Sequence, residues 1–325
     1  MANSSIVEWT IENSSRLNLE VTRVTWVDEW LPGYFDYQVK IAAGGKTYIG
    51  RGIDAVEDLA FAKAAAEALE RAATYGLRDC WATAAYPDLS GAKERAYSEL
   101  LGIDRVLCHH YCRRGVRVLG QEALGTSFPI KPFFKMLQKN RLEITILEFT
   151  PSLDAKVAGV FVSSLDPACA VKGFVKGYGV EKTLESAVIH ALIECMRNSV
   201  TVFLGGATPN PGELSCGPTN PRWHFWQAQT AESMKYLRTH FVAGSVAGSR
   251  LEPESVSIAD ASFTQLNTLD SIFPEVPLCF VQAHSDKLLK PQFGRFQADM
   301  DTMKRLEMFN GSAVNLDASV PHFYG

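Results

Sequence analysis

The stretch YIGRGIDAVEDLAFAKAAAEALERAATYG, residues 48–76, decides how the rest of the sequence is interpreted. A strand is predicted at its start, Gly50-Arg51-Gly52 interrupts the pattern, and a helix is predicted from Asp54 to Gly76. The apolar stripe of this helix contains only leucine and alanine: Leu59, Ala62, Ala66, Leu69 and Ala73. Because these side chains are small, we expect the helix to lie very close to whatever it packs on.

The segment before this helix is predicted as a strand hairpin within a strand region that begins at residue 17. In residues 35–41 apolar side chains alternate with Asp36, Gln38 and Lys40, the pattern of a half-buried strand. Gly44-Gly45 then supplies the positive φ angles that a tight hairpin needs. The following Lys-Thr makes this turn look like the end of a P-loop. A P-loop needs another glycine five residues before Gly45, but that position is Lys40. We therefore do not interpret the turn as a nucleotide site.

The same order of elements is predicted a second time further along the chain. Strands are expected at 143–151, 157–165 and 170–180, followed by a helix over 181–203. The second Gly-x-Gly leads into a helix that contains Glu194, as the first leads to Glu67 and Glu70, which predicts an internal strand–Gly-x-Gly–helix repeat. Further helices are expected at 91–112 and 231–241, and a strand at 276–283. No low-complexity linker separates these parts. We therefore expect one α+β domain over 1–325, with interleaved halves at about 17–115 and 140–325.

Composition excludes several classes of protein. Of the 325 residues 46% are hydrophobic and 21% are charged, and the formal net charge is -4. Such mild acidity gives no electrostatic case for nucleic acid or an anionic membrane as the main partner. No apolar run reaches the length of a membrane span, and the first residues do not resemble a signal peptide, so a cytoplasmic location is expected.

The seven cysteines show no spacing typical of disulfide frameworks or zinc ribbons, and reduced thiols are expected. The densest group is CHHYC, residues 108–112. A metal site there would need a second pair of ligands at zinc-finger distance, and none is present. We favour small thiols packed in a core beside partly exposed histidines.

Two glutamates lie near the apolar stripe of the first helix. With 100° per residue, Glu70 falls about 60° from the centre of the stripe and Glu67 on its flank. A carboxylate at the edge of a core is costly unless something pairs with it. One interpretation is a salt bridge, to Arg71 or to another arginine. The other is that glutamates from several helices bind a divalent cation; oxygen ligands suit magnesium, and magnesium suits a nucleoside triphosphate.

Four stretches, at 50–76, 94–107, 177–199 and 276–295, resemble the YcaO family in order and spacing. The strongest match is Glu67-x-x-Glu70-Arg71. The resemblance implies mixed and antiparallel sheets with packed helices, and an ATP- and magnesium-dependent enzyme without a P-loop. In that family a nucleophile adds to a peptide backbone carbonyl and the oxyanion attacks the γ-phosphate. Departure of phosphate then leaves an azoline, thioamide or amidine.

The resemblance also implies site residues. Metal ligands are expected at Glu67, Glu70, Glu99 and Glu194, and nucleotide contacts at Arg71, Arg197 and Arg295. The chain departs from the family pattern at several of its positions: Lys63, Gly102, Ile103, Arg197, Ser199 and Thr208. Gly102-Ile103 replaces an acid and an arginine, and Arg197 replaces a glutamine. The tail SVPHFYG lacks the alternating prolines of azoline-forming members.

Two functions follow from the resemblance. The first is ATP-dependent activation of backbone amides, by azoline-forming cyclodehydration or a related reaction, in the biosynthesis of a ribosomally made, modified peptide. The second is a degenerate YcaO subunit that binds peptide or scaffolds an active partner. Under either function we expect a precursor peptide and a separate leader-recognition or activating protein as partners. The sequence leaves open whether the assembly is a homodimer or a hetero-complex.

Overall fold

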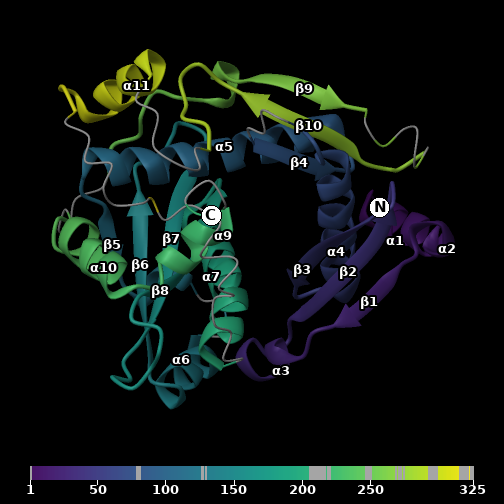
Figure 1. The fold of residues 1–325 in the computed structure, drawn as a ribbon, viewed down its shortest axis with the longest axis horizontal. Coiled ribbons are helices and arrows are strands. Elements are labelled where there is room, and N and C mark those ends of the chain that lie inside the picture. Colours follow the sequence, from purple (N-terminus) through teal and green to yellow (C-terminus); the bar gives the residue numbers. More distant parts are fainter. Residues whose placement is uncertain are drawn as a thin grey trace. The chain divides into compact units, whose positions relative to one another are not determined.

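The computed structural model describes residues 2–77, 82–125, 128, 130–204, 217, 221–245, 251–267, 269, 273, 275–291, 299–314 and 322. The chain, shown in Figure 1, separates into two compact units. The first comprises Met1–Glu99 and Ala261–His284, and the second comprises Leu100–Asp260 and Ser285–Gly325. The boundaries of these units are not those of the predicted halves. The first boundary, after Glu99, falls inside the helix Leu89–Cys112, and the late segment Ala261–His284 belongs to the first unit.

The first unit contains two antiparallel sheets of three strands each. One sheet has the order β1-β2-β3, with strands Glu20–Arg23, Phe35–Ala43 and Lys46–Asp54. The other has the order β4-β10-β9, with strands Ala82–Tyr86, Cys279–His284 and Ser262–Leu266. The helices are α1 (Ala2–Glu12), α2 (Ser14–Leu17), α3 (Trp26–Trp30), α4 (Glu57–Ala73) and the first part of α5 (Leu89–Cys112).

The predicted hairpin is confirmed. Strand β2 pairs with β3 from Phe35↔Asp54 to Ala43↔Lys46, and Gly44 and Gly45 have φ angles of 56° and 74°. Asp36 corrects the predicted polar face, because it is completely buried rather than solvated. Its Oδ2 atom accepts hydrogen bonds from the Trp26 indole N–H and the Arg51 guanidinium, which offset part of its lost hydration, while no described residue donates to Oδ1.

The predicted strand over residues 17–27 is largely wrong. Only Glu20–Arg23 is extended, and Trp26–Trp30 forms a short helix. Its two acidic residues, Asp28 and Glu29, lie in the first helical turn, where the helix dipole favours negative charge. Val27 and Trp30, at helical spacing, are buried. The sequence analysis also missed helix α1, which anchors Ile6 in the core that β2 and α4 share.

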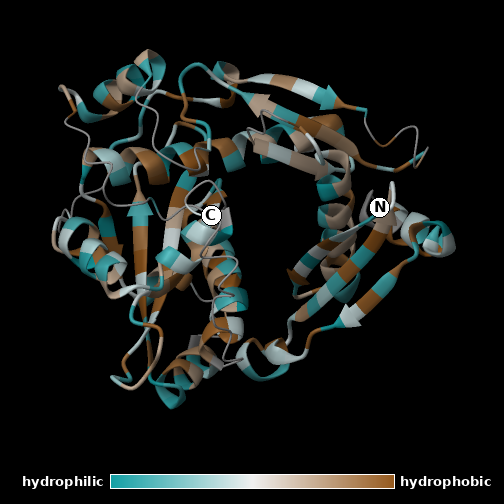
Figure 2. Cartoon of the chain, in the orientation of Figure 1, coloured by the Kyte–Doolittle hydropathy of each residue, from teal (hydrophilic) through white to brown (hydrophobic). Residues whose placement is uncertain are grey.

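The second unit is built on one antiparallel sheet with the order β5-β6-β7-β8. These strands are Arg117–Leu119, Leu142–Phe149, Lys156–Ser164 and Phe174–Glu181. They are largely hydrophobic in Figure 2, and in β7 every residue from Val157 to Ser163 is buried, as expected for a strand covered on both faces. The helices are the rest of α5, α6 (Ile130–Lys139), α7 (Leu184–Ser199), α9 (Pro221–Gln227), α10 (Ala231–Tyr236) and α11 (Met300–Asn310).

The described residues also contain four short helical segments. They are 3-10 turns at Gln121–Leu124 and Ile258–Asp260, and π-helical turns at Val200–Leu204 and Leu237–Val242, which continue α7 and α10. Most predicted elements of this unit are confirmed, but residues 170–173 are not part of the strand. No described helix is both long and apolar enough to cross a membrane.

Two glycine-bearing strands lie directly against their helices. A Cβ atom added to Gly50 would lie 2.1 Å from the Ala64 oxygen of α4, and one added to Gly177 would lie 2.2 Å from the Ala191 oxygen of α7. Gly52 and Gly179 are equally close to the backbones of the same two helices. The expectation that α4 packs very closely is thus confirmed. Its contact face runs through Ala60, Ala64 and Ala68, whereas Leu59 and Ala66 are only half-buried. An internal repeat of the whole fold stays a prediction.

Replacing either Gly50 or Gly177 by alanine should destabilise the protein strongly. The added methyl group would meet backbone atoms, which cannot rotate away as a side chain can, so we expect a loss of about 3 kcal/mol, at the upper end of overpacking costs. Chemical denaturation measures it. The control is Thr47→Ala, on the same strand as Gly50 but exposed, which should cost less than about 0.5 kcal/mol. Equal stability of Gly50→Ala and Thr47→Ala would contradict the close approach.

Candidate functional site

Helix α4 presents Glu67 and Arg71 to the edge strand β3. The Glu67 Oε2 atom accepts a hydrogen bond from the backbone N–H of Arg51 at 2.7 Å, and its Oε1 atom pairs with the Arg71 guanidinium at 2.5 Å. Arg71 also donates to the backbone carbonyl of Ile49. The two side chains therefore satisfy one donor and one acceptor at the open edge of β3, where a further strand would otherwise bind.

Glu70 lies one turn further along α4 and reaches strand β4. Its two carboxylate oxygens accept hydrogen bonds from the Thr83 hydroxyl at 2.8 Å and the Ala85 N–H at 3.1 Å. Burial, reinforced by the charge of Glu67, raises the pKa of Glu70 to about 7, although these hydrogen bonds and Arg71 work in the other direction. Near neutral pH this carboxyl therefore exchanges between its protonated and ionised forms.

Glu99, on α5, meets the same part of β4. Its Oε2 atom accepts a hydrogen bond from the backbone N–H of Thr83 at 3.1 Å, so that Thr83 contacts both Glu99 and Glu70. Of the three acids, which are up to 32 residues apart in the sequence, Glu70 and Glu99 thus meet at β4, whereas Glu67 lies at the edge of β3. The sequence analysis missed Thr83, because the short segment ATAAY of β4 carries no clear strand signal.

This gathering is not a preformed metal centre. Among the described residues no group of three or more His, Cys, Asp or Glu side chains is placed to hold a metal ion. Each of the three acids instead accepts a hydrogen bond from a strand of the first unit. A cation would have to replace or share some of these bonds.

The second unit repeats one of these contacts. Glu194, on α7, accepts a hydrogen bond from the backbone N–H of Tyr178 at 2.7 Å, and Tyr178 stands between Gly177 and Gly179 as Arg51 stands between Gly50 and Gly52. The position four residues after Glu194 is Asn198, so the arginine that pairs with Glu67 has no counterpart there.

A lysine lies beside this edge of the second unit. Lys176 is buried on β8, and no described residue hydrogen-bonds its Nζ atom. Burial lowers its pKa to about 7, against the opposing charge of Glu194. Lys176 is not among the residues predicted from the sequence; the available signal was a single charged residue inside an otherwise apolar strand before a Gly-x-Gly.

Of the predicted nucleotide contacts, Arg71 lies beside Glu67, as described above. Arg197 lies three residues after Glu194 on α7, a spacing at which the two could pair, but it forms no salt bridge with Glu194 or with any other described residue. Arg295 lies outside the described residues, as does Thr208. Lys63, where the family often has serine, pairs with Asp54 at 2.6 Å.

The altered positions of the second motif are part of a core. Ile103 is fully buried, and a Cβ atom on Gly102 would lie 3.0 Å from a Val180 methyl group. The next two residues, Asp104 and Arg105, do not substitute for the missing acid and arginine, because two residues turn a helix by about 200°.

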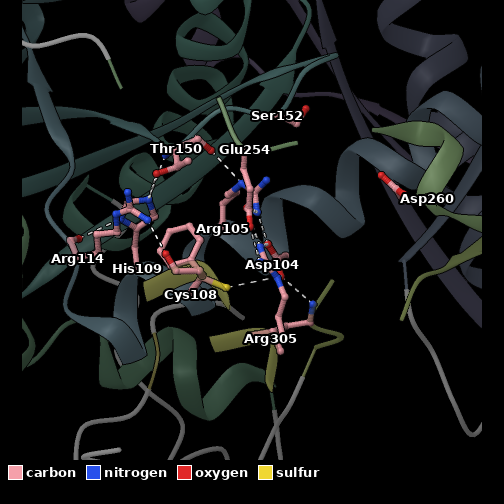
Figure 3. A network of polar contacts seen from close by, with 12 residues as sticks. Asp104, Arg105, Cys108, His109, Arg114, Thr150, Ser152, Glu254, Asp260 and Arg305 are labelled. Carbon is pink, nitrogen blue, oxygen red and sulfur yellow. Dashed lines mark hydrogen bonds and ion pairs between the residues drawn. The ribbon is translucent and has the colours of Figure 1, made fainter. Parts of the chain in front are cut away.

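Asp104 and Arg105 belong to a buried ionic network (Figure 3). The Asp104 carboxylate binds Arg305 of α11 at 2.7 Å and 2.8 Å, and Arg305 also pairs with Glu254 at 2.6 Å. Burial alone would raise the pKa of Asp104, but Arg305 and Arg105 hold it below its usual value. This network connects α5, α11 and residue 254 within the second unit, and its charges compensate one another.

The histidines of CHHYC are not partly exposed, as the sequence suggested, but buried. The His109 Nε2 atom accepts a hydrogen bond from the Thr150 N–H at 3.0 Å, so its Nδ1 atom carries the proton and donates to the Arg114 carbonyl. Burial lowers the pKa of His109 to about 3 and keeps it neutral. Cys108 is buried as expected.

Comparisons with known proteins place this geometry in a known fold. No protein-family model and no curated protein matches the sequence. Among solved structures, a heterocyclase in complex with substrate and cofactor matches with a TM-score of 0.60 and 11% identity over 88% of this chain, which spans only 52% of the heterocyclase. A YcaO protein from Methanopyrus kandleri, bound with AMPPCP and Mg²⁺, matches with a TM-score of 0.55 and 14% identity, over 87% of this chain and 90% of that one. The chain therefore has a YcaO-like fold, with the mixed helices and antiparallel sheets predicted from its sequence.

Proposed function

We propose that this protein binds ATP with magnesium and activates backbone amides of a precursor peptide, by azoline-forming cyclodehydration or by a related thioamidation or amidine formation. The observation that carries the proposal is that Glu70 and Glu99 meet at Thr83 of β4, with Glu67 one helical turn from Glu70 and close enough for its charge to act on it, as the YcaO resemblance implied for metal ligands. The likeness of the fold to a YcaO protein bound with AMPPCP and Mg²⁺ supports it.

The donor set fits magnesium. All the predicted ligands, Glu194 included, offer carboxylate oxygens, the ligands that magnesium prefers. Glu70 gives a specific reason: burial and the nearby charge of Glu67 raise its pKa to about 7, and a bound cation would favour its ionised form. When bound, magnesium ATP would supply the phosphoryl group that receives the amide oxygen, while arginines such as Arg71 and Arg197 would bind its phosphates.

A second function is favoured by a specific observation. Gly102 and Ile103, at the positions of a lost acid and a lost arginine, are packed into a core, so no side chain there replaces the missing charges. A YcaO-like subunit that binds peptide or scaffolds an active partner, without ATP turnover, would tolerate this loss. We place catalysis first because all four predicted glutamates are retained.

In either role the protein would meet a precursor peptide and a separate partner protein for leader recognition or activation. A heterocyclase of similar fold was solved in complex with substrate and cofactor, which supports a role of this fold in holding a substrate. The cytoplasmic location stays a prediction.

Calorimetric titration with ATP and magnesium tests the binding. We expect heat of binding for the unaltered protein and at least tenfold weaker affinity for Glu70→Gln or Glu99→Gln, a change of about 1.4 kcal/mol. Lys46→Ala is the control: Lys46 lies on the hairpin, stacks on Tyr75 and should leave the affinity unchanged. Absence of binding at millimolar nucleotide by a folded protein would reject the nucleotide site. Binding without peptide-dependent phosphate release would favour the second function.

Glu70 should make stability depend on pH. Its folded-state pKa of about 7 lies above the ordinary 4.5, so between these values the folded state holds more protons than the unfolded state. The free energy of unfolding therefore falls as the pH rises through this range, by up to about 3 kcal/mol at 1.36 kcal/mol per pKa unit.

Denaturation of the protein and of Glu70→Gln from pH 4 to pH 8, without magnesium, measures this effect. Glutamine is neutral throughout, so its stability relative to the unaltered protein should increase as the pH rises towards about 7 and then level off. A constant difference between the two proteins over the whole range would mean that the pKa of Glu70 is not raised.

Arg197 gives a test of phosphate binding. Because it forms no salt bridge with a described residue, its guanidinium is available for a bidentate contact with phosphate. Arg197→Gln should weaken ATP binding and lower any peptide-dependent phosphate release, whereas Arg23→Gln, at an exposed arginine of β1 that pairs with Asp28, should change neither. Unchanged values for Arg197→Gln would remove it from the proposed site and favour the degenerate subunit.

A further inference from the structure

Strand β8 carries a buried cation that the second unit does not pair. Lys176 is 4% exposed, and no described residue hydrogen-bonds its Nζ atom or forms a salt bridge with it. An ammonium group that loses its hydration without gaining a partner destabilises a folded protein. The packing of the second unit therefore does not explain why a lysine occupies this position, and such groups are typical of functional sites.

The surroundings of the Lys176 side chain are aromatic. The two glycines of β8 face helix α7, which lies beside the strand in Figure 1, so Lys176 points to the opposite face of the sheet. Phe161 is its cross-strand partner on this face. The Phe161 ring packs edge-on against Phe174 at 5.2 Å and Tyr178 at 6.0 Å, the next residues on the same face of β8. Such rings suit the apolar stem of a lysine but do not replace the hydration of its charged head.

The backbone of Lys176 lies at the outer edge of the sheet. Strand β8 is the last in the order β5-β6-β7-β8. The N–H groups of Tyr178 and Phe174 point away from β7, because they donate to Glu194 and to the Ala228 carbonyl. Alternate N–H groups of a strand point the same way, so the Lys176 N–H, between these two, also points to the edge. A flexible four-carbon stem allows the ammonium group to reach the same edge.

The first unit shows which charge Lys176 replaces. The contact of Glu67 with a strand N–H recurs at Glu194, 127 residues later. The residue 127 positions after Arg71 is an asparagine, but Lys176 lies at this interval from Ile49, whose carbonyl Arg71 contacts. The cation beside the acid thus comes from the helix in the first unit and from the strand in the second. Arg71 is paired with its acid, whereas the Lys176 ammonium has no described partner.

We propose that Lys176 binds a phosphate group of the magnesium nucleotide at the edge of β8, beside Glu194. A free anion would be repelled by the Glu194 carboxylate at this edge. A metal-bound phosphate would bring a cation for Glu194 and an anion for Lys176, so it fits both side chains. The inference rests on the proposed function, in which Glu194 is a metal ligand. Lysine binds phosphate as a point charge, and the phosphate would supply the partner that the described residues do not.

Two measurements on Lys176→Met test the proposal. Methionine keeps much of the stem and removes the charge. Without ligand, the melting temperature should be unchanged or higher, because an unpartnered buried charge is replaced by an apolar group. Calorimetric titration well below the melting temperature should show about tenfold or weaker affinity for magnesium ATP and for magnesium tripolyphosphate, which offers the phosphates alone. Lys172→Met, at an exposed lysine near the start of the same strand, is the control and should change neither quantity.

Three outcomes would overturn the proposal. They are a melting temperature lowered by Lys176→Met alone, which would make the ammonium group a support of the fold, an unchanged affinity for magnesium tripolyphosphate, and equal weakening by both variants. The proposed function fails in a different way. Equal binding of magnesium ATP by Lys176→Met and the unaltered protein would reject only the role of Lys176. Tripolyphosphate binding that depends on Lys176, without any binding of ATP, would reject only the nucleotide function, and a folded protein that binds neither ligand would reject both.

Discussion

The close approach of a Gly-x-Gly strand to its helix is the constraint on which both units depend. With glycine at positions 50 and 177, helix backbone atoms lie where a side chain would otherwise begin. At this distance a glutamate on the helix can reach round the edge of the strand and accept the N–H of the residue between the glycines. Glu67 does so at Arg51 and Glu194 at Tyr178, both at 2.7 Å. The packing of small residues thus positions carboxylates at the edges of sheets.

These carboxylates have a structural role as well as a proposed chemical one. Glu67 satisfies the open edge of β3 and is held by Arg71, and Glu70 accepts two hydrogen bonds from β4. Such bonds keep the acids in place without metal, but a cation must compete with them. Four residues after Glu194 the chain has Asn198 and not an arginine, and Glu194 is held by a single described hydrogen bond. It would therefore lose fewer existing contacts than Glu67 on binding a cation.

Much of this could be predicted from local patterns. The alternation of residues 35–41, the two glycines of the hairpin and the small residues of α4 each determine geometry over a few residues, and all three predictions hold. The failures involve partners distant in sequence. Asp36 was assigned to solvent because nothing local shows that Trp26 and Arg51 meet it, and Thr83 joins Glu70 to Glu99 only through tertiary contacts. The buried histidines of CHHYC depend likewise on Thr150 and Arg114.

The central claim is that helix glutamates placed by the glycine contacts hold the metal of a magnesium nucleotide. A crystal structure with a non-hydrolysable ATP analogue and manganese in place of magnesium tests it most directly, because the anomalous signal of manganese locates the metal independently of the nucleotide. The account predicts a metal peak at roughly 2.1 Å from carboxylate oxygens of Glu67, Glu70 or Glu99, near the usual magnesium–oxygen distance. A nucleotide whose metal lies away from all of these acids, or a folded protein that takes up neither at millimolar concentration, would contradict it.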